Sequence, residues 1–177
     1  RVEWVSLGGG LYFTKAGYPV EEFCARLKQF AAKFNVQIYL EPGESAITGC
    51  AELVTTVVDI VHNEMDVAIV DASVEPHMLD LLIYRLSAKV DAAVPDGRQY
   101  MIAGRSCLAG DIFGAYRFPD PLAVGDEVRF ADAAGYTMVK KNWFNGLQMP
   151  SIVVRRLNGD LEILREFGYN DFLDNLS

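Results

Sequence analysis

A single amphipathic segment near the start of the chain places the strongest constraint on its fold. Apolar side chains recur at helical spacing over residues 20–34, with charged side chains largely opposite, which predicts a helix. The apolar runs 2–7 and 36–40 flank it and are typical of strands. These runs end in Gly8-Gly9-Gly10 and Glu41-Pro42-Gly43. Such a strand–helix–strand unit predicts parallel α/β architecture, in which functional groups gather at the carboxyl ends of strands.

From Ser45 onward the pattern changes to short apolar runs that indicate β-strands. These runs cover residues 53–61, 67–70, 99–103, 127–132, 152–157 and 161–166, and short helices are expected over 76–84, 142–147 and 169–176. Asn158-Gly159 predicts a hairpin with a two-residue turn. We therefore expect residues 1–44 to be the last strands and helix of a TIM-type (β/α)8 barrel whose remainder lies upstream. Residues 45–177 should form an all-β domain of β-barrel or Greek-key type.

Charge and hydropathy argue against two kinds of partner. The formal charge is −8, and the 16 basic residues are scattered, whereas nucleic-acid binding needs clustered Lys and Arg. No apolar run is long enough to span a bilayer, and no basic segment followed by an apolar one indicates a secretion signal. We expect neither a nucleic-acid partner nor a membrane. The first residue is Arg, inside a predicted strand, which indicates a piece of a longer chain.

Cysteine and histidine usage bears on compartment and metals. Three cysteines without a CxxC spacing, Cys24, Cys50 and Cys107, favour a reducing compartment, and we expect the cytoplasm. The two histidines, His62 and His77, have no partner at metal-ligand or triad spacing. No metal site is therefore expected.

The stretch Gly104–Asp111 holds the most distinctive chemistry of the chain. Small residues surround Cys107, glycines stand on both sides of it, and Asp111 follows four positions later. Because apolar runs flank this stretch, it predicts a turn that presents the thiol and the carboxylate at a sheet edge. The alternative is a buried structural cysteine, which is common for this residue type.

Four other positions are candidates for binding. The backbone N–H groups of Gly8-Gly9-Gly10 can hold a phosphate, and Glu41 can hold a cationic ring nitrogen. Tyr136 can donate its phenol to a phosphate, and Asp71, at the end of an apolar run, can meet a cation. For each the alternative is structural: turns for the first two, a core side chain for Tyr136, and a turn former for Asp71.

Four motifs in this order resemble the alanine-racemase-like (fold type III) pyridoxal-phosphate decarboxylases, which include the ornithine and diaminopimelate decarboxylases. The motifs are Gly8–Gly10, Glu41–Gly43, Gly104–Asp111, and Tyr136-Thr137 followed by Phe144–Gly146. The resemblance runs along all 177 residues as the C-terminal half of such an enzyme, and is strongest to members that act on carboxylated polyamines.

The resemblance implies pyridoxal 5'-phosphate as the cofactor. Glu41 would pair with its pyridine nitrogen and keep that nitrogen protonated. The phosphate would be held by Gly8, Gly9 and Gly10, by the backbone at Gly43 and by the Tyr136 hydroxyl.

The resemblance also implies a homodimer with shared active sites. Cys107, delivered from the partner subunit, would return a proton to the α-carbon after CO2 departs, a task that suits a thiol. Asp71 and Asp111 would bind the distal amines of a carboxylated polyamine.

Two departures and one absence bear on these roles. Glu44 stands where relatives often carry Arg, and Leu108 stands where they often carry an acid after the cysteine, which disfavours an ornithine-like or diaminopimelate-like pocket. Lys15, Lys140 and Lys141 do not match the motif of the family's cofactor-binding lysine, which would belong to an N-terminal half of the same enzyme. Two alternatives therefore stay open: a non-catalytic relative that binds a polyamine or a partner decarboxylase, and a diaminopimelate- or ornithine-type enzyme.

Overall fold

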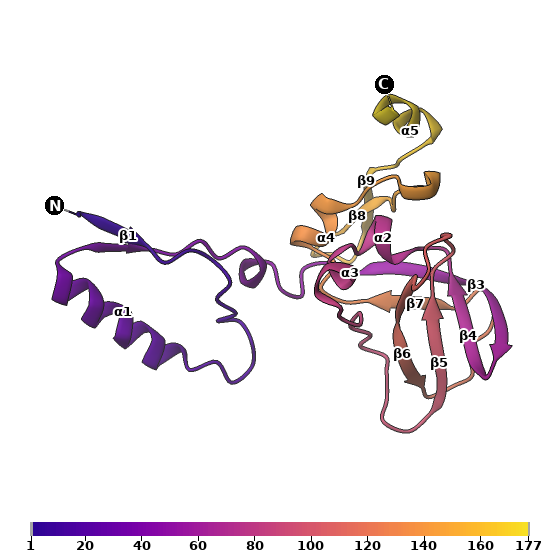
Figure 1. The fold of residues 1–177 in the computed structure, drawn as a ribbon, viewed down its shortest axis with the longest axis horizontal. Helices are drawn as coiled ribbons and strands as arrows, with labels where there is room; N and C mark the ends of the chain where they lie inside the picture. Colours follow the sequence, from indigo (N-terminus) through magenta and orange to yellow (C-terminus); the bar gives the residue numbers. More distant parts are fainter. Residues whose placement is uncertain (1, 177) are drawn as a thin grey trace. The chain divides into compact units, whose positions relative to one another are not determined.

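The computed structural model describes residues 2–176, and their contacts divide the chain into two compact units between Ala51 and Glu52 (Figure 1). The expected boundary lay earlier, at residues 44 and 45. The short 3-10 helix η1 (Glu44–Ala46) belongs to the first unit because the Ser45 hydroxyl donates to the Leu11 carbonyl at 2.6 Å. Each unit is described by itself.

The first unit is the predicted strand–helix–strand arrangement. Strand β1 (Trp4–Ser6) and strand β2 (Gln37–Tyr39) pair in parallel, with Val5 opposite Ile38, and helix α1 (Val20–Phe34) connects them. The helix ends at Asn35, which adopts the left-handed conformation that asparagine tolerates (φ 49°). None of the α1 residues is buried, and the rings of Phe30 and Phe34 on its apolar side contact each other. The apolar stripe that predicted the helix is thus only partly covered within this unit, where Phe23, Leu27 and Ala31 are half-buried.

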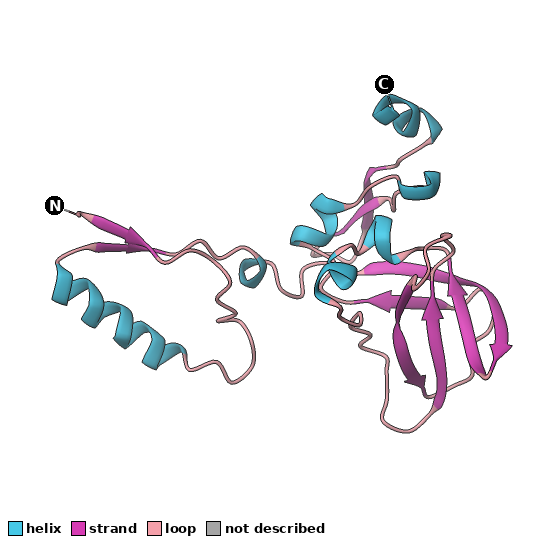
Figure 2. Cartoon of the chain, viewed as in Figure 1, coloured by secondary structure: helices cyan, strands magenta, loops and turns pink. Residues whose placement is uncertain are grey.

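The second unit is built on a five-stranded sheet in the order β6-β5-β4-β3-β7 (Figure 2). The strands are β3 (Leu53–Asn63), β4 (Met65–Val70), β5 (Arg98–Ala103), β6 (Ile112–Phe118) and β7 (Glu127–Phe130). Pairing is antiparallel except between β4 and β5, which run parallel. The predicted sheet domain is therefore present, but its sheet is mixed and short helices interrupt it, which the expectation of an all-β domain of β-barrel or Greek-key type did not include. A parallel pair needs a crossover, and residues 71–97 supply it with helices α2 (Val74–His77) and α3 (Asp80–Tyr84).

The sheet curls around one apolar core. The ring of Phe113 on β6 stacks on the ring of Phe130 on β7 with centroids 4.3 Å apart, so the two end strands of the sheet meet through their side chains. Both rings are fully buried. The same core contains Val57, Ala68, Val70, Val74, Tyr100, Ile102 and Val128.

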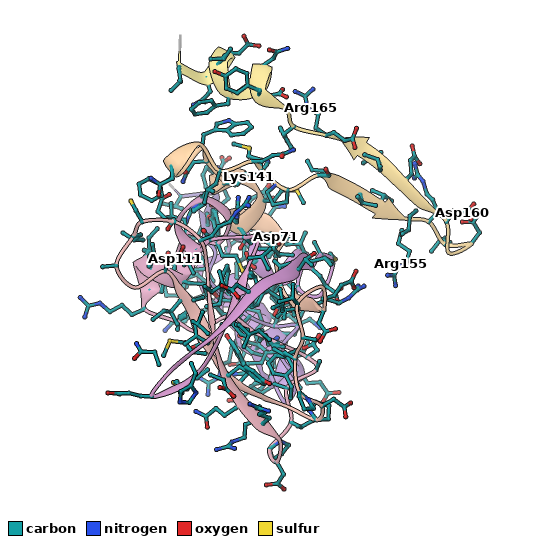
Figure 3. All side chains as sticks on the ribbon, turned by 90° about the vertical axis from the view of Figure 1, so that its right-hand side faces the viewer. Asp71, Asp111, Lys141, Arg155, Asp160 and Arg165 are labelled. Carbon is teal, nitrogen blue, oxygen red and sulfur yellow. The ribbon has the colours of Figure 1, made fainter. Side chains whose placement is uncertain are left out.

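The last part of the chain contains α4 (Gly135–Lys140), the 3-10 turn η2 (Phe144–Gly146), the antiparallel hairpin β8 (Ile152–Arg155) with β9 (Leu161–Arg165), and α5 (Tyr169–Leu176). Figure 3 labels the hairpin at Arg155 and Asp160. The hairpin was predicted, but its turn is longer than two residues: Arg156 N–H donates to the Asp160 carbonyl at 2.8 Å, and Gly159 alone takes the positive φ (93°). No helix within residues 2–176 combines the length and apolar character that crossing a membrane requires.

Candidate functional site

The two glycine-containing strand ends of the first unit lie side by side. Glu41 N–H donates to the Gly8 carbonyl at 2.9 Å, which continues the β1–β2 pairing beyond the strands. The Ser6 hydroxyl donates to the Glu41 carboxylate at 2.5 Å and accepts a hydrogen bond from Gly8 N–H at 3.1 Å. A Cβ on Gly9 would lie 2.6 Å from the Glu41 carbonyl oxygen, so only glycine fits at this position.

These strand ends form a cradle that fits the expected cofactor. Gly8 and Gly10 both have positive φ (71° and 77°), a geometry that can turn backbone N–H groups toward an anion. Because Gly8 N–H donates to Ser6, a phosphate would be met by the N–H groups of Gly9 and Gly10. A concavity of about 320 Å³ lies beside them, lined by Trp4, Ser6, Tyr39, Leu40 and Glu41. A carboxylate and a glycine backbone are therefore available together, as a protonated ring nitrogen and a phosphate require. Gly43 is the N-cap residue of η1, and its carbonyl accepts a hydrogen bond from Ala46 N–H.

Cys107 is exposed, so the buried-cysteine alternative is wrong. The loop that carries Cys107 is fixed by hydrogen bonds to the buried side chain of Asp111, which is only 6% exposed. One carboxylate oxygen of Asp111 accepts from Val74 N–H at 2.7 Å; the other accepts from the Ser106 N–H at 2.9 Å and from the Ser106 hydroxyl at 2.6 Å. The thiol is thus presented on a loop with a fixed backbone.

Asp71 also has backbone partners. One of its carboxylate oxygens accepts from Thr56 N–H at 2.9 Å, and its own N–H donates to the Thr56 carbonyl. This pairing joins the end of β4 to β3 beside a register shift between Val57 and Asp59. Figure 3 labels Asp71 and Asp111 in the body of the second unit. Their binding of substrate amines stays a prediction, and their contacts here give both carboxylates a structural role.

Tyr136 lies on α4, a helix that the sequence pattern did not predict. The residue is 55% exposed, so the alternative of a core tyrosine is wrong. The Lys140 ammonium lies 4.6 Å from the Tyr136 ring centroid and pairs with Asp80 at 2.5 Å. The Asp80 carboxylate raises the pKa of Lys140, so a fixed positive charge stands next to the phenol.

Two residues to which the sequence analysis gave no role of their own, Asn145 and His77, lie near the cysteine loop. Asn145 contacts the loop directly, and His77 contacts Ser73, which is bonded to it. Cys107 N–H donates to the Asn145 side-chain oxygen at 3.1 Å, and Asn145 adopts a left-handed conformation (φ 58°) inside η2. His77 is buried on α2, where its Nδ1 accepts from Ser73 N–H at 3.0 Å and its Nε2 donates to the Gln148 carbonyl at 3.1 Å. The Phe144-Asn145-Gly146 motif was the available signal for Asn145, whereas nothing near His77 in the sequence indicated its partners.

The model of one protein family matches residues 30–134, and its description is pyridoxal-dependent decarboxylase, C-terminal sheet domain. The chain belongs to this family. Its five-stranded mixed sheet is the C-terminal sheet domain of the pyridoxal-dependent decarboxylases, and the family's cofactor is pyridoxal phosphate.

Two decarboxylase sequences and one crystal structure are similar to the chain. It is 51% identical, over its whole length, to a carboxynorspermidine/carboxyspermidine decarboxylase of Herminiimonas arsenicoxydans, of which it covers 48%. It is 37% identical over 99% of its length to a carboxyaminopropylagmatine decarboxylase of a Synechocystis species, of which it covers 47%. A crystal structure of carboxynorspermidine decarboxylase from Campylobacter jejuni, complexed with norspermidine, matches 98% of the chain with a TM-score of 0.89 and 38% identity, over 51% of that structure. The chain thus spans about half the length of the decarboxylases it matches.

Proposed function

We propose that this chain is the C-terminal half of a cytoplasmic enzyme that decarboxylates carboxynorspermidine and carboxyspermidine to norspermidine and spermidine in polyamine biosynthesis. Its N-terminal half would complete the (β/α)8 barrel, of which β1, α1 and β2 are the last elements. The apolar side of α1, of which no residue is fully buried, supports a continuation of that fold. The observation that carries the proposal is the exposed thiol of Cys107 on a loop whose backbone is fixed, within a chain 51% identical to such a decarboxylase.

The cofactor would be bound by Glu41, by backbone groups of glycines 8–10 and 43, and by Tyr136. Pyridoxal phosphate, when bound, supplies an electron sink for the pair of electrons left behind when CO2 departs. The Glu41 carboxylate would keep the ring nitrogen protonated, with its own orientation fixed by the Ser6 hydroxyl. The phosphate would be held by the backbone at Gly8–Gly10 and Gly43 together with the Tyr136 hydroxyl, beside which the Lys140 ammonium adds positive charge.

Cys107 would complete the reaction in a homodimer with shared active sites. The bond between the α-carbon and the carboxylate breaks, CO2 leaves, and the Cys107 thiol gives its proton to the same carbon. The thiolate then takes a proton back from water, so that the cycle is balanced. A thiol is an acid of intermediate strength, which suits a donor that must be reprotonated in every turnover.

The substrate would be a carboxylated polyamine, a flexible chain with several ammonium groups. A chain with a net charge of −8 favours such a cation. Leu108 after the cysteine and Glu44 after Glu-Pro-Gly distinguish this pocket from that expected for ornithine or diaminopimelate. Asp71 and Asp111 remain the candidates for the distal amines, and both would have to keep their backbone partners while doing so.

The test uses the full-length protein. It should show the visible absorbance band of the bound cofactor and release CO2 from carboxynorspermidine and carboxyspermidine, with much lower turnover of diaminopimelate and ornithine. Cys107→Ser should reduce kcat by about 100-fold or more, because a poorly acidic hydroxyl replaces the proton donor. Cys24→Ser, at another exposed cysteine, is the control and should leave kcat unchanged. Absence of the cofactor band, or equal turnover of all four substrates, would refute the proposal, and polyamine binding without turnover would favour a non-catalytic relative.

A further inference from the structure

The cysteine loop and α2 are tied together at two points. Asp111 links them through its carboxylate, which accepts from Val74 N–H on α2 and from Ser106 in the loop. Ser73, which is fully buried, makes the second link, because its hydroxyl accepts from Arg105 N–H at 3.0 Å. The residues at the start of α2, Ser73 and Val74, are therefore linked by hydrogen bonds to the cysteine loop, Ser73 directly and Val74 through Asp111.

His77 ties this same turn to a third segment. Its Nδ1 accepts from Ser73 N–H, so the proton of the neutral ring stands on Nε2, which donates to the Gln148 carbonyl. A second pair of bonds runs parallel to this one: Asn142 N–H donates to the Pro76 carbonyl at 2.9 Å, and the Asn142 side-chain amide donates to Glu75. Residues 142–148 are thereby fixed to α2.

The third segment returns to the cysteine. Asn145, between Asn142 and Gln148, accepts from Cys107 N–H. The bonds therefore form a closed circuit from the cysteine loop through Ser73 and His77 to residues 142–148 and back to Cys107. Ser73, Val74 and His77 are all buried, so water does not compete for the bonds at the centre of this circuit.

We propose that His77 and Asp111 are positioning residues for Cys107, and that the circuit through α2 fixes the place at which the thiol is presented. This inference rests on the proposed function, in which Cys107 delivers a proton to one carbon. A donor with that task must be placed within a fraction of an ångström, although its side chain is exposed. The charged groups that act on the His77 ring are Arg105, Asp111 and Asp71, and only a neutral ring can accept the Ser73 N–H bond.

Two substitutions at His77 separate the two bonds of its ring. Asn at this position keeps an acceptor near the place of Nδ1 and loses the bond to Gln148. Gln keeps a donor near the place of Nε2 and loses the acceptor for Ser73 N–H. Because the Ser73 bond lies on the side of the cysteine loop, His77→Gln should have the larger effect on Cys107. His62→Gln is the matched control, since His62 is the other histidine of the chain and is exposed on β3.

The experiment uses the full-length holoenzyme with Cys24 and Cys50 replaced by alanine. The rate of Cys107 alkylation by iodoacetamide is measured by peptide mass spectrometry, and kcat, KM and the cofactor band are measured on the same samples. His77→Gln should lower kcat by at least about tenfold, the factor expected for one buried hydrogen bond, with little change in KM or cofactor content. It should also change the alkylation rate, whereas His77→Asn should restore most of both and His62→Gln should alter neither.

Alkylation reports on the thiol itself, so the two proposals fail in different ways. A wild-type alkylation rate and kcat in folded His77→Gln would overturn the positioning role. Full activity of Cys107→Ser would instead overturn the proton-donor role and leave the alkylation result standing. If His77→Gln does not fold, Ser73→Ala removes only the bond to Arg105 N–H, and unchanged alkylation and kcat in that variant would equally overturn the inference.

Discussion

Gly104 lies where the support of the cysteine loop is least tolerant of added volume. A Cβ at this position would lie 2.4 and 2.5 Å from the two carboxylate oxygens of Asp111 and 2.6 Å from its Cγ, well inside contact distance. The φ of Gly104 is not positive, so the backbone itself would accept alanine. The carboxylate cannot move aside without breaking its bonds to Val74 and Ser106.

Gly104→Ala should therefore destabilise the second unit by about 3 kcal/mol. A hydrogen bond to a charged group contributes about 1.5–3 kcal/mol, and at least two such bonds to Ser106 are broken when the carboxylate shifts. Alanine lowers the entropy of the unfolded chain, which offsets roughly 0.4–1 kcal/mol of that loss. The same shift should displace Cys107 and lower kcat.

The assay is urea denaturation of the full-length protein followed by circular dichroism. Gly168→Ala is the matched control: Gly168 also lies beside an aspartate that accepts its N–H, but a Cβ there would be 4.0 Å from the Asp171 carboxylate. It should change the free energy of unfolding by less than about 0.5 kcal/mol. If Gly104→Ala and Gly168→Ala unfold at the same urea concentration, the fixed position of Asp111 is wrong.

Two further predictions concern the buried side chain of His77 and the partly buried side chain of Tyr116. Burial lowers the pKa of His77 below its ordinary value of 6.5, so as pH falls the unfolded chain takes up the proton before the folded chain does. The free energy of unfolding should therefore be highest above pH 6.5 and decline below it, by up to about 1.4 kcal/mol per pH unit before carboxylates titrate. Urea denaturation from about pH 7 to 5 measures this slope, and a slope equal to that of His77→Gln would contradict the prediction. The Tyr116 hydroxyl lies 2.7 Å from the Ala88 carbonyl and 2.8 Å from that of Phe113, and burial raises the pKa of Tyr116 to about 12. Tyr116→Phe should cost about 1–3 kcal/mol in the same assay because it leaves the Ala88 carbonyl without this donor, whereas the Phe113 carbonyl still accepts from Ala88 N–H; an unchanged midpoint would contradict that reason.

Local pattern was sufficient for most strands and for α1. The apolar run 53–61 corresponds to β3 (Leu53–Asn63), and the helical spacing over 20–34 corresponds to α1. The sequence alone indicates such elements because a short apolar run is typical of a strand, and apolar residues on one face of a helix recur with the helical period. Helix α4 was missed because six residues beginning with Gly135 give no full period and low helix propensity. The parallel pairing of β4 with β5 was missed because strand direction depends on contacts across the chain, not on either run alone.

Those parts of the candidate site that depend on neighbouring residues could be predicted from the sequence, whereas those that depend on distant partners could not. The glycines around Cys107 indicated an open loop, and the thiol is exposed. The partner of Asp111 on α2 lies 37 residues away in sequence, and the carbonyl that holds His77 lies 71 residues away. No local rule selects such partners, so the sequence indicated Asp111 only as a candidate substrate ligand, and its role in the support of the loop could be seen only in the structure.

The direction of one strand pair explains why these distant residues meet. Because β4 and β5 run the same way, with Ile69 opposite Ala103, both strands finish at a common edge, where the chain leaves β4 toward Ser73 and leaves β5 toward Cys107. Had the pair been antiparallel, as an all-β design would have it, those exits would stand at opposite edges. The place at which the Cys107 thiol is exposed thus follows from strand direction. In parallel α/β folds functional groups gather at the carboxyl ends of neighbouring parallel strands, and the same arrangement occurs here in a sheet that is otherwise antiparallel.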